Sequence, residues 1–293
     1  MGKITLALLG QHTRIYLADT TDMVEEARII HDTSPVATAA LGRTLTAASI
    51  MGKMLKGEKD KLTLQIKGKG PIRSVVAVAW PGGDVKVTIS DPKVTVEDTP
   101  EGKLNVGEAV GKEGELILIR DYGLKEPYVG RSPLVSGEIA EDLAYYYAHS
   151  EQQPSVVALG VLAEPQRKVA AAGGFIAQPL PTITENELEA LEGDIAKMPG
   201  ISGLMGRDLT AREILERLFP SLPVTIMETG EVKLTCDCSK EKLSRALLTI
   251  GEEDLREILE VDGQAELHCH FCAKVYHFDE DELRALYEES RRK

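Results

Sequence analysis

The sequence is poor in features that mark several large classes of protein. Its 293 residues contain four cysteines, and none of them lies before Cys236. Secreted proteins held together by disulfides are usually short and rich in cysteine, so this class is excluded. No stretch approaches the ~18 apolar residues of a membrane span. The apolar run at residues 4–9 is too short for a signal peptide, so we expect a cytoplasmic protein with reduced thiols.

Basic residues are also scarce, and the shortage is uneven along the chain. The formal net charge is -13 at pH 7. Residues 1–182 contain 20 basic and 22 acidic residues, whereas residues 183–293 contain 14 basic and 25 acidic residues. A protein that binds the phosphate backbone needs a basic face, so this balance argues against a general nucleic-acid binder. Hydrophobic residues make up 43%, which excludes wholesale disorder, and the length predicts about two domains.

The chain from residue 1 to residue 178 mixes helical and strand patterns. Ser34 followed by Pro35 is typical of a helix start, and the stretch that follows, up to Leu55, is apolar all round, which predicts a buried helix. Apolar and polar residues alternate over residues 62–67, which indicates a half-buried strand. The predicted helices cover residues 22–31, 36–55 and 139–149, and the predicted strands cover residues 62–67, 75–80, 85–89, 116–120, 155–163 and 169–176. Helices mixed with antiparallel hairpins favour an α+β fold over a doubly wound sheet.

Two short amphipathic helices are predicted after the Pro179-Leu180-Pro181 break. Thr184 with Glu187, and Thr210 with Glu213, have the spacing of capping boxes. Apolar stripes follow, formed by Leu188, Leu191, Ile195 and Met198 in the first helix and by Ile214, Leu215 and Leu218 in the second. Two interpretations stay open. The segment is either a helical hairpin packed on the first domain or a linker to the part of the chain that carries the cysteines.

The four cysteines form two tight pairs, Cys236 with Cys238 and Cys269 with Cys272, which lie well apart in the sequence. Four thiolates in two such pairs fit one tetrahedral zinc site, and soft thiolates exclude magnesium and calcium. The alternative is a set of buried structural thiols without a metal. The surrounding pattern predicts a short strand at residues 232–234, helices at residues 240–250, at 252–260 and after Asp279, and a hairpin formed by residues 265–268 and 275–278.

Three histidines lie near the second cysteine pair and are further candidate ligands. They are His268, His270 and His277, and with four cysteines available we expect them to be exposed or to support the ligands. A thiolate is also the form that oxidants attack. Because binding of a structural zinc ion contributes much of a small domain's folding energy, we expect oxidation to unfold residues 231–293.

Over essentially its whole length the chain resembles the bacterial redox-regulated heat-shock chaperone family, heat shock protein 33 or the 33 kDa chaperonin. The most specific part is Cys236-Asp237-Cys238-Ser239 with Cys269-His270-Phe271-Cys272, followed by Tyr276 and Phe278. Further matching segments are Leu41-Gly42-Arg43, Gln65-Ile66-Lys67-Gly68-Lys69-Gly70-Pro71, Ser150-Glu151-Gln152-Gln153-Pro154 and Ala172-Gly173-Gly174-Phe175.

This resemblance implies a chaperone and not an enzyme: an ATP-independent holdase that binds unfolding proteins and prevents their aggregation under oxidative and heat stress. Pattern and resemblance together divide the chain into an N-terminal α+β chaperone domain (1–178), a helical linker (179–231) and a C-terminal zinc-binding redox-switch domain (232–293). The reduced, inactive form is implied to hold one zinc ion on Cys236, Cys238, Cys269 and Cys272. Oxidation is implied to pair Cys236 with Cys238 and Cys269 with Cys272, to release zinc, and to yield an active homodimer.

Three other functions are weighed against this one. A thiol–disulfide oxidoreductase would use the Cys269-x-x-Cys272 spacing, but such enzymes place the motif where a strand meets a helix, and the pattern here predicts a hairpin. A zinc-ribbon adaptor for nucleic acid conflicts with the acidic last third of the chain. An enzyme in the first domain would need a phosphate loop, a dinucleotide fingerprint or a catalytic set, and none stands out. We therefore expect neither a nucleic-acid nor a membrane partner.

Overall fold

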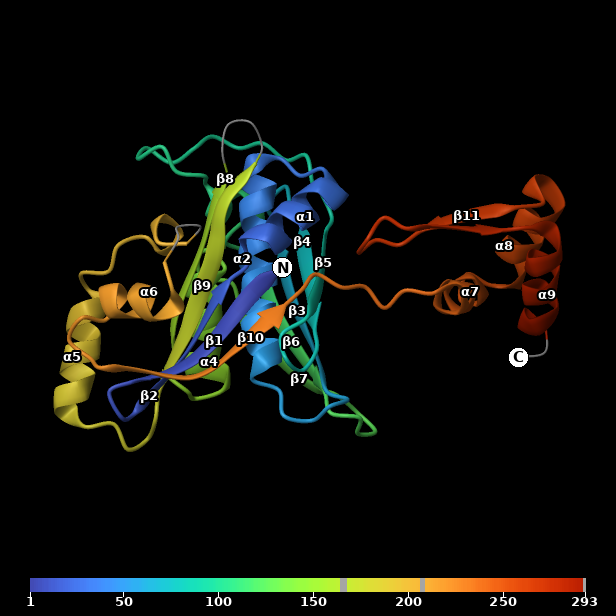
Figure 1. The fold of residues 1–293 in the computed structure, drawn as a ribbon. Helices are drawn as coiled ribbons and strands as arrows, with labels where there is room; N and C mark the ends of the chain where they lie inside the picture. Colours follow the sequence, from blue (N-terminus) through green and yellow to red (C-terminus); the bar gives the residue numbers. More distant parts are fainter. Residues whose placement is uncertain (164–167, 206–208, 292–293) are drawn as a thin grey trace. The chain divides into compact units, whose positions relative to one another are not determined.

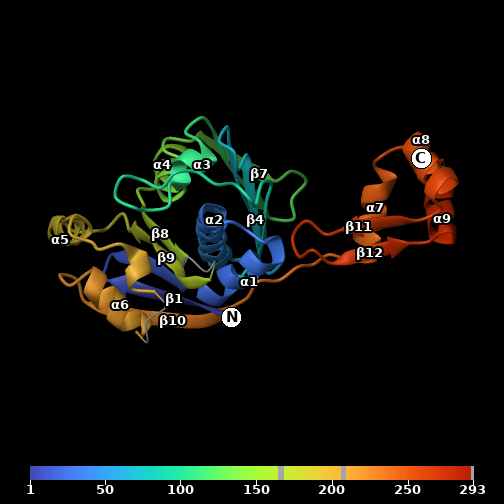
Figure 2. The same cartoon turned by 90° about the horizontal axis from the view of Figure 1, so that it is seen from above.

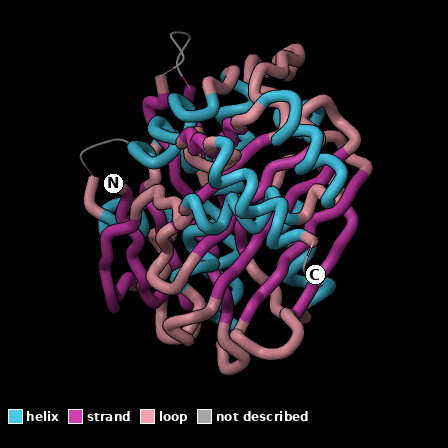
Figure 3. The backbone as a smooth tube through the Cα atoms, turned by 90° about the vertical axis from the view of Figure 1, so that its right-hand side faces the viewer, coloured by secondary structure: helices cyan, strands magenta, loops and turns pink. Residues whose placement is uncertain are grey.

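The computed structural model describes residues 1–163, 168–205 and 209–291. They divide into two compact units, Met1–Thr235, here called the sheet unit, and Cys236–Lys293, here called the cysteine unit (Figure 1). Helices and antiparallel strands are mixed along the chain in both units (Figure 3). The α+β fold class predicted from the sequence is confirmed.

Two five-stranded antiparallel sheets form the frame of the sheet unit. The first has the strand order β10-β1-β2-β9-β8, and the second has the order β5-β4-β3-β6-β7. The strands of the first sheet are β1 (Gly2–Leu9), β2 (Thr13–Asp19), β8 (Val156–Ala163), β9 (Val169–Pro179) and β10 (Val224–Val232). Those of the second are β3 (Lys61–Gly68), β4 (Ser74–Ala79), β5 (Val85–Ile89), β6 (Gly114–Asp121) and β7 (Tyr128–Pro133). The six strands predicted in residues 1–178 are confirmed, and β1, β2 and β7 are additional. The strand predicted at residues 232–234 is wrong in its bounds, since β10 ends at Val232 and Leu234 forms only an isolated bridge with Val85.

Helix α2 (Pro35–Lys53) is the centre of the sheet unit. As predicted, Ser34 is its N-cap, and the Ser34 hydroxyl accepts a hydrogen bond from the backbone N–H of Ala37. The helix lies between the two sheets (Figure 2) and packs on β8 and β9 on one side and on β3, β4 and β5 on the other. Because both sides are covered, nearly all of its residues are buried, which explains why its sequence is apolar all round.

Three further helices lie in the chain up to residue 178. They are α1 (Thr21–His31), α3 (Val106–Val110) and α4 (Ala140–Ser150). The helices predicted at residues 22–31 and 139–149 are confirmed as α1 and α4, and α3 is additional. Among the described ranges, no helix is both long and apolar enough to cross a membrane.

The described residues between 179 and 231 form two helices, a 3-10 turn and most of a strand. These elements are α5 (Glu185–Ile195), η1 (Ile201–Gly203), α6 (Ala211–Leu218) and β10. Helix α6 begins with the predicted capping box of Thr210 and Glu213. Helix α5 begins after Thr184 as predicted, but the carboxylate of Glu187 instead accepts the backbone N–H of Gln11 (2.7 Å) and contacts His12 (2.5 Å). These partners lower the pKa of Glu187 and join α5 to the β1–β2 turn.

Helices α5 and α6 cover the face of the first sheet that points away from α2. Ile15, Leu17 and Phe175 on the sheet form one buried cluster with α5, η1 and α6. The predicted apolar stripes account for the helix side of this cluster, with Leu191, Ile214, Leu215 and Leu218 buried and Ile195 and Met198 partly buried. Leu188 is the exception, since it is 37% exposed. The described residues between 179 and 231 thus belong to the sheet unit, where α5, η1 and α6 pack on the first sheet.

The cysteine unit is small and has its own core. Its elements are α7 (Lys240–Leu248), α8 (Glu252–Glu257), the π-helical turn η2 (Ile258–Asp262), β11 (Ala265–His268), β12 (Val275–Phe278) and α9 (Glu280–Ser290). The predicted helices and hairpin are confirmed, although α7 ends at Leu248. Six buried side chains form the core: Leu247, Leu255, Tyr276, Phe278, Leu283 and Leu286. The Lys240 ammonium contacts the Glu282 carboxylate at 2.5 and 2.7 Å, which joins α7 to α9.

Candidate metal and redox centre

The two cysteine pairs lie on two different backbone segments of the cysteine unit. Cys236 and Cys238 lie in the segment between β10 and α7, just before Ser239, which is the N-cap of α7. Cys269 and Cys272 lie in the turn between β11 and β12. The turn is closed by hydrogen bonds from the backbone N–H of Cys269 to the Lys274 carbonyl and from the N–H of Ala273 to the Cys269 carbonyl, each 2.9 Å long.

The structure brings all four thiols together. Their Sγ atoms lie within 4.8 Å of one another. The Sγ atoms of Cys236 and Cys269 are 3.7 Å apart, and those of Cys238 and Cys272 are 3.5 Å apart. These distances are far longer than the ~2.05 Å of a disulfide, and all four cysteines are free thiols. The arrangement is a closed set of four sulfur atoms that can hold one metal ion.

The surroundings of the thiols shift their pKa values in different directions. Burial raises the pKa of Cys236 and that of Cys272 above the usual range of a thiol. Burial also acts to raise the pKa of Cys238, but hydrogen bonds from the Tyr276 hydroxyl and from the neighbouring thiols outweigh it and lower this pKa to about 7. The Cys238 thiol is thus the one whose pKa its hydrogen bonds lower.

Tyr276 has a role at the site that the sequence reasoning did not identify. Its ring belongs to the core of the cysteine unit, and its hydroxyl lies 3.1 Å from the Sγ atom of Cys238. The only sequence signal was that Tyr276 belongs to the motif that carries the family resemblance. In the structure a hydroxyl fixed by a buried ring can donate a hydrogen bond to a thiolate, as side chains around metal ligands commonly do.

Replacing Tyr276 with phenylalanine is expected to lower the affinity for zinc roughly tenfold, because groups that support metal ligands typically contribute about 10- to 100-fold. Competition with a coloured zinc chelator measures the change. Tyr287→Phe is a matched control, since the Tyr287 hydroxyl lies 3.4 Å from Glu252, away from the thiols, and this variant should retain the parent affinity. Equal affinities for both variants would show that the Tyr276 hydroxyl is dispensable.

The three nearby histidines lie outside the sulfur cluster. His268, His270 and His277 are all exposed. His268 and His277 contact the two carboxylate oxygens of Glu266, at 2.7 and 3.2 Å. Within the described ranges, the only group of His, Cys, Asp and Glu side chains placed to hold a metal ion is the set of four cysteines.

The turn position of Cys269 and Cys272 bears on the oxidoreductase alternative. Enzymes that exchange disulfides place a Cys-x-x-Cys motif at a helix N-terminus, where the helix dipole lowers the thiol pKa. Here both cysteines lie between two strands, and the next helix, α9, begins at Glu280, after β12. Neither thiol therefore lies in the first turn of a helix, where a dipole would act on it.

A larger α+β unit followed by a small unit that gathers four thiols defines a two-part protein with a cluster of thiols that could hold a metal ion. The chain belongs to the Hsp33 family, since the family model described as Hsp33 protein matches residues 4–279. The 33 kDa chaperonins of Clostridioides difficile and Alkaliphilus metalliredigens are 50% and 47% identical to it over 276 residues, which cover 94% of each chain. The crystal structure of the 33 kDa chaperonin (heat shock protein 33 homolog) from Thermotoga maritima is 38% identical and matches with a TM-score of 0.88 over 99% of both chains.

The family predicted from the cysteine motifs is thereby confirmed. Membership makes this chain a redox-regulated chaperone and not an enzyme. The four clustered thiols fit a redox-sensing metal site in such a protein.

Proposed function

We propose that this protein is a holdase that works without ATP and is activated by oxidation of Cys236, Cys238, Cys269 and Cys272. In the reduced, inactive form the four thiolates hold one zinc ion. In the oxidised form Cys236 pairs with Cys238, and Cys269 with Cys272, and the protein holds unfolding clients. The observation that carries this proposal is the set of four sulfur atoms within 4.8 Å in a chain of the Hsp33 family.

Zinc is the metal that the donor set fits best. In a tetrahedral four-sulfur site with bonds of ~2.3 Å, neighbouring sulfurs are about 3.8 Å apart. The observed separations of 3.5 Å and 3.7 Å are close to this value. Four thiolates also leave no position open for water, which is typical of structural zinc. When bound, the ion would cross-link the segment before α7 to the β11–β12 turn.

The cysteine unit has only a small core, which such a cross-link would stabilise. It comprises only Cys236–Lys293, and its core consists of six buried side chains. Domains of this size commonly depend on a metal. Zinc contributes roughly 10–16 kcal/mol to the folding of small zinc domains. Oxidation that removes the thiolate ligands is therefore expected to unfold the unit.

The oxidation step is balanced by two equivalents of peroxide. Each disulfide forms as two thiolates lose two electrons, and one hydrogen peroxide molecule takes up those electrons and two protons to give two water molecules. The proposed pairing joins sulfurs within each motif. These sulfurs already lie within 4.8 Å of each other, so pairing needs only local movement.

The proposed switch reaches the sheet unit through the chain segment that precedes Cys236. Strand β10 pairs with β1 along its whole length. The N–H of Thr235 then donates to the Val85 carbonyl (2.9 Å), and the N–H of Val85 donates to the Lys233 carbonyl (3.1 Å). The residue directly before Cys236 is thus tied to the edge of the second sheet. Unfolding that starts at Cys236 would first break this short pairing and then reach β10.

Residues 179–231 are the proposed linker, between a chaperone domain at 1–178 and a redox-switch domain at 232–293. In the resting protein α5 and α6 cover one apolar face of the first sheet. Release of these helices would expose both their own stripes and the sheet face. Large exposed apolar surfaces bind other apolar surfaces, which suits unfolded clients and a second copy of the chain. The protein is proposed to be cytoplasmic and to dimerise on activation, with no nucleic-acid or membrane partner.

The proposal is tested by measuring metal release and chaperone activity on the same samples. Reduced protein should hold one zinc ion per chain and let a chemically unfolded client aggregate. After peroxide treatment at raised temperature it should release the zinc, lose four titratable thiols and suppress light scattering by the client without added ATP. Reduction should restore the resting state. Full suppression of aggregation by the reduced zinc form, unchanged by peroxide, would contradict the switch.

A further inference from the structure

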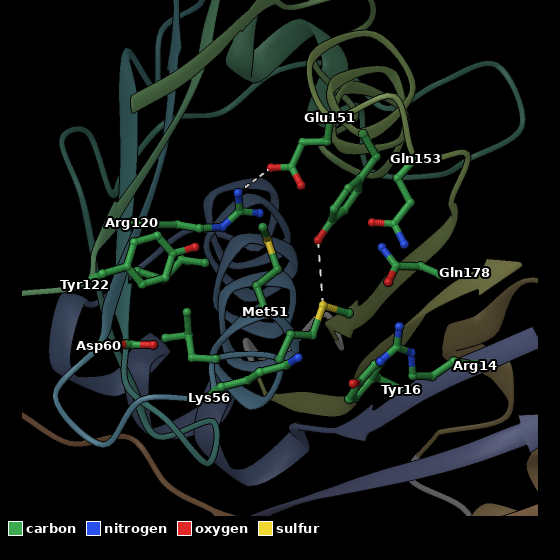
Figure 4. Close-up of a pocket in the computed structure, with 14 residues that line it drawn as sticks. Arg14, Tyr16, Met51, Lys56, Asp60, Arg120, Tyr122, Glu151, Gln153 and Gln178 are labelled. Carbon is green, nitrogen blue, oxygen red and sulfur yellow. Dashed lines mark hydrogen bonds and ion pairs between the residues drawn. The ribbon is translucent and has the colours of Figure 1, made fainter. Parts of the chain in front are cut away.

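A polar pocket of about 400 Å³ lies inside the sheet unit, near the C-terminal end of α2 (Figure 4). Strands of both sheets contribute to its wall, with Arg14 and Tyr16 from β2, Gln178 from β9 and Arg120 from β6. Its volume is typical of pockets that bind small molecules. None of the four cysteines lines it, and it has no part in the switch described above.

Arg14 is placed in this pocket by the strand register. It lies directly opposite Gln178 on the neighbouring strand, and it shares a face of β2 with Tyr16, which belongs to the core between the sheets. The Nε atom of Arg14 is buried without a hydrogen-bond partner, and no ion pair joins its guanidinium to a carboxylate in the described ranges. Arg14 is half-buried, and buried polar atoms are normally hydrogen-bonded, so its Nε can donate to an acceptor group of a bound ligand, for which an anion suits the cationic guanidinium best.

A second cation without a partner lines the same pocket. Lys56, in the loop after α2, forms no ion pair with any described residue, and Figure 4 shows its side chain and that of Arg14 on the side of the pocket opposite Glu151. The two carboxylates of the pocket are already engaged. Glu151 pairs with Arg120 at 2.6 Å, and Asp60 accepts the backbone N–H of Gly57 at 2.9 Å. Three cations, Arg14, Lys56 and Arg120, line the pocket against two carboxylates, so it has an excess of one positive charge in a chain whose net charge is -13.

The rest of the pocket is suited to an apolar group. Met51, Met54, Leu55 and Leu62 form this part of the wall. Met51 and Leu62 are buried in the core, so this wall is held firmly. Methionine side chains adapt readily to aromatic and irregular shapes. A ligand that satisfies both parts of the wall has one anionic group and an apolar or aromatic body.

We infer that this pocket binds a small organic anion, a carboxylate or a phosphate monoester on an apolar or aromatic body, and that Arg14 and Lys56 bind its charged group. Arg14 contributes a fixed, directional donor, and Lys56 contributes an exposed point charge that attracts the anion.

The inference is tested with the fluorescent anion anilinonaphthalene sulfonate and its uncharged analogue phenylnaphthylamine, both added to the reduced full-length protein. We expect one anion to bind per chain, at least roughly tenfold more tightly than the uncharged analogue. Arg14→Gln should weaken binding of the anion at least tenfold, because hydrogen bonds to charged groups are strong when buried. Lys56→Gln, at an exposed position, should weaken it roughly threefold. Neither change should alter binding of the uncharged analogue.

Lys59→Gln is the matched control, because it removes one positive charge from the same exposed loop at a position that does not line the pocket. It should leave binding unchanged. Displacement of the probe by benzoate or by phenyl phosphate identifies the preferred anion. The inference is overturned if neither benzoate nor phenyl phosphate displaces the probe, if the uncharged analogue binds as tightly as the anion, or if Lys56→Gln leaves binding unchanged. These outcomes can be read even if the Arg14 variant does not fold.

Discussion

Replacing Cys269 with serine is expected to unfold the cysteine unit and to leave the sheet unit folded. Cys269 is the buried member of the four cysteines, and a serine hydroxyl is not a zinc ligand at neutral pH. Binding of zinc by a complete four-thiolate set contributes ~10–16 kcal/mol to the folding of small zinc domains, and without Cys269 this set is incomplete, so the unit loses the cross-link on which its fold depends. The two large clusters of the sheet unit contain no residue beyond Leu234, so they do not depend on the metal.

The expected functional result is activity without an oxidant. An unfolded cysteine unit should destabilise residues 179–231 in the reduced protein, so Cys269→Ser should suppress client aggregation before peroxide is added. Zinc content measures the loss of the metal, and circular dichroism measures the unfolding of the cysteine unit. Hydrogen exchange resolved by segment measures the destabilisation of residues 179–231. Ala273→Ser is a suitable control, because Ala273 is exposed in the same turn and carries no ligand. A variant that loses zinc but keeps α7 and α9 protected from exchange would refute the dependence of the fold on the metal.

The best predicted elements are those whose signal is local. Ser34 and Pro35, two adjacent residues, indicate the start of α2. The alternation of apolar and polar residues over 62–67 matches the alternating burial of side chains along β3. The cysteine cluster was also predictable, because two close pairs need only one fold of the chain to bring them together. In each case the information lies within a few neighbouring residues.

The three strands that were not predicted, and β10, whose bounds were predicted wrongly, have a different physical origin. β1 and β2 lie in a sheet covered on both faces, by α2 and by α5 with α6, so neither strand shows a clean alternation of polar and apolar residues. β7 is an edge strand that contains Gly130 and ends at Pro133, residues that weaken a strand signal. β10 is rich in polar residues and is held by its pairing with β1, at the opposite end of the sheet unit's sequence. Such strands are set by tertiary pairing, which a local pattern does not contain.

The same limit applies to the details of the two sites. The contact of Tyr276 with Cys238 depends on how the β11–β12 hairpin packs against the segment before α7. The pocket around Arg14 depends on the register between β2 and β9 and on a second sheet on the other side of α2. The sequence shows that Tyr276 and Arg14 are present, but it does not show which side chains they contact in the folded protein.

Replacing Phe219 with alanine is expected to activate the reduced, zinc-loaded protein. Phe219 is fully buried at the end of α6, and its ring meets that of Phe175 on β9 edge to face, with 5.5 Å between centroids. Truncating such a residue costs about 3–5 kcal/mol, a large part of the roughly 5–15 kcal/mol that stabilises a typical domain. The loss falls on the contact between α6 and the first sheet, so this contact should open while the four thiols keep their metal.

Leu188→Ala is the matched control for this prediction, because Leu188 lies on α5 of the same segment but is 37% exposed. It should leave both helix protection and activity close to those of the parent. Hydrogen exchange over α5 and α6 and client light scattering, measured on samples with one zinc ion per chain, separate opening of the linker from loss of metal. If Phe219→Ala exposes α6 and the sheet face but clients still aggregate, then the surface beneath α5 and α6 is not where clients bind. Activation with zinc retained would instead show that opening of the linker is sufficient for activity. The cysteines would then act only by releasing the linker, and the sheet face beneath it would be the surface that holds clients.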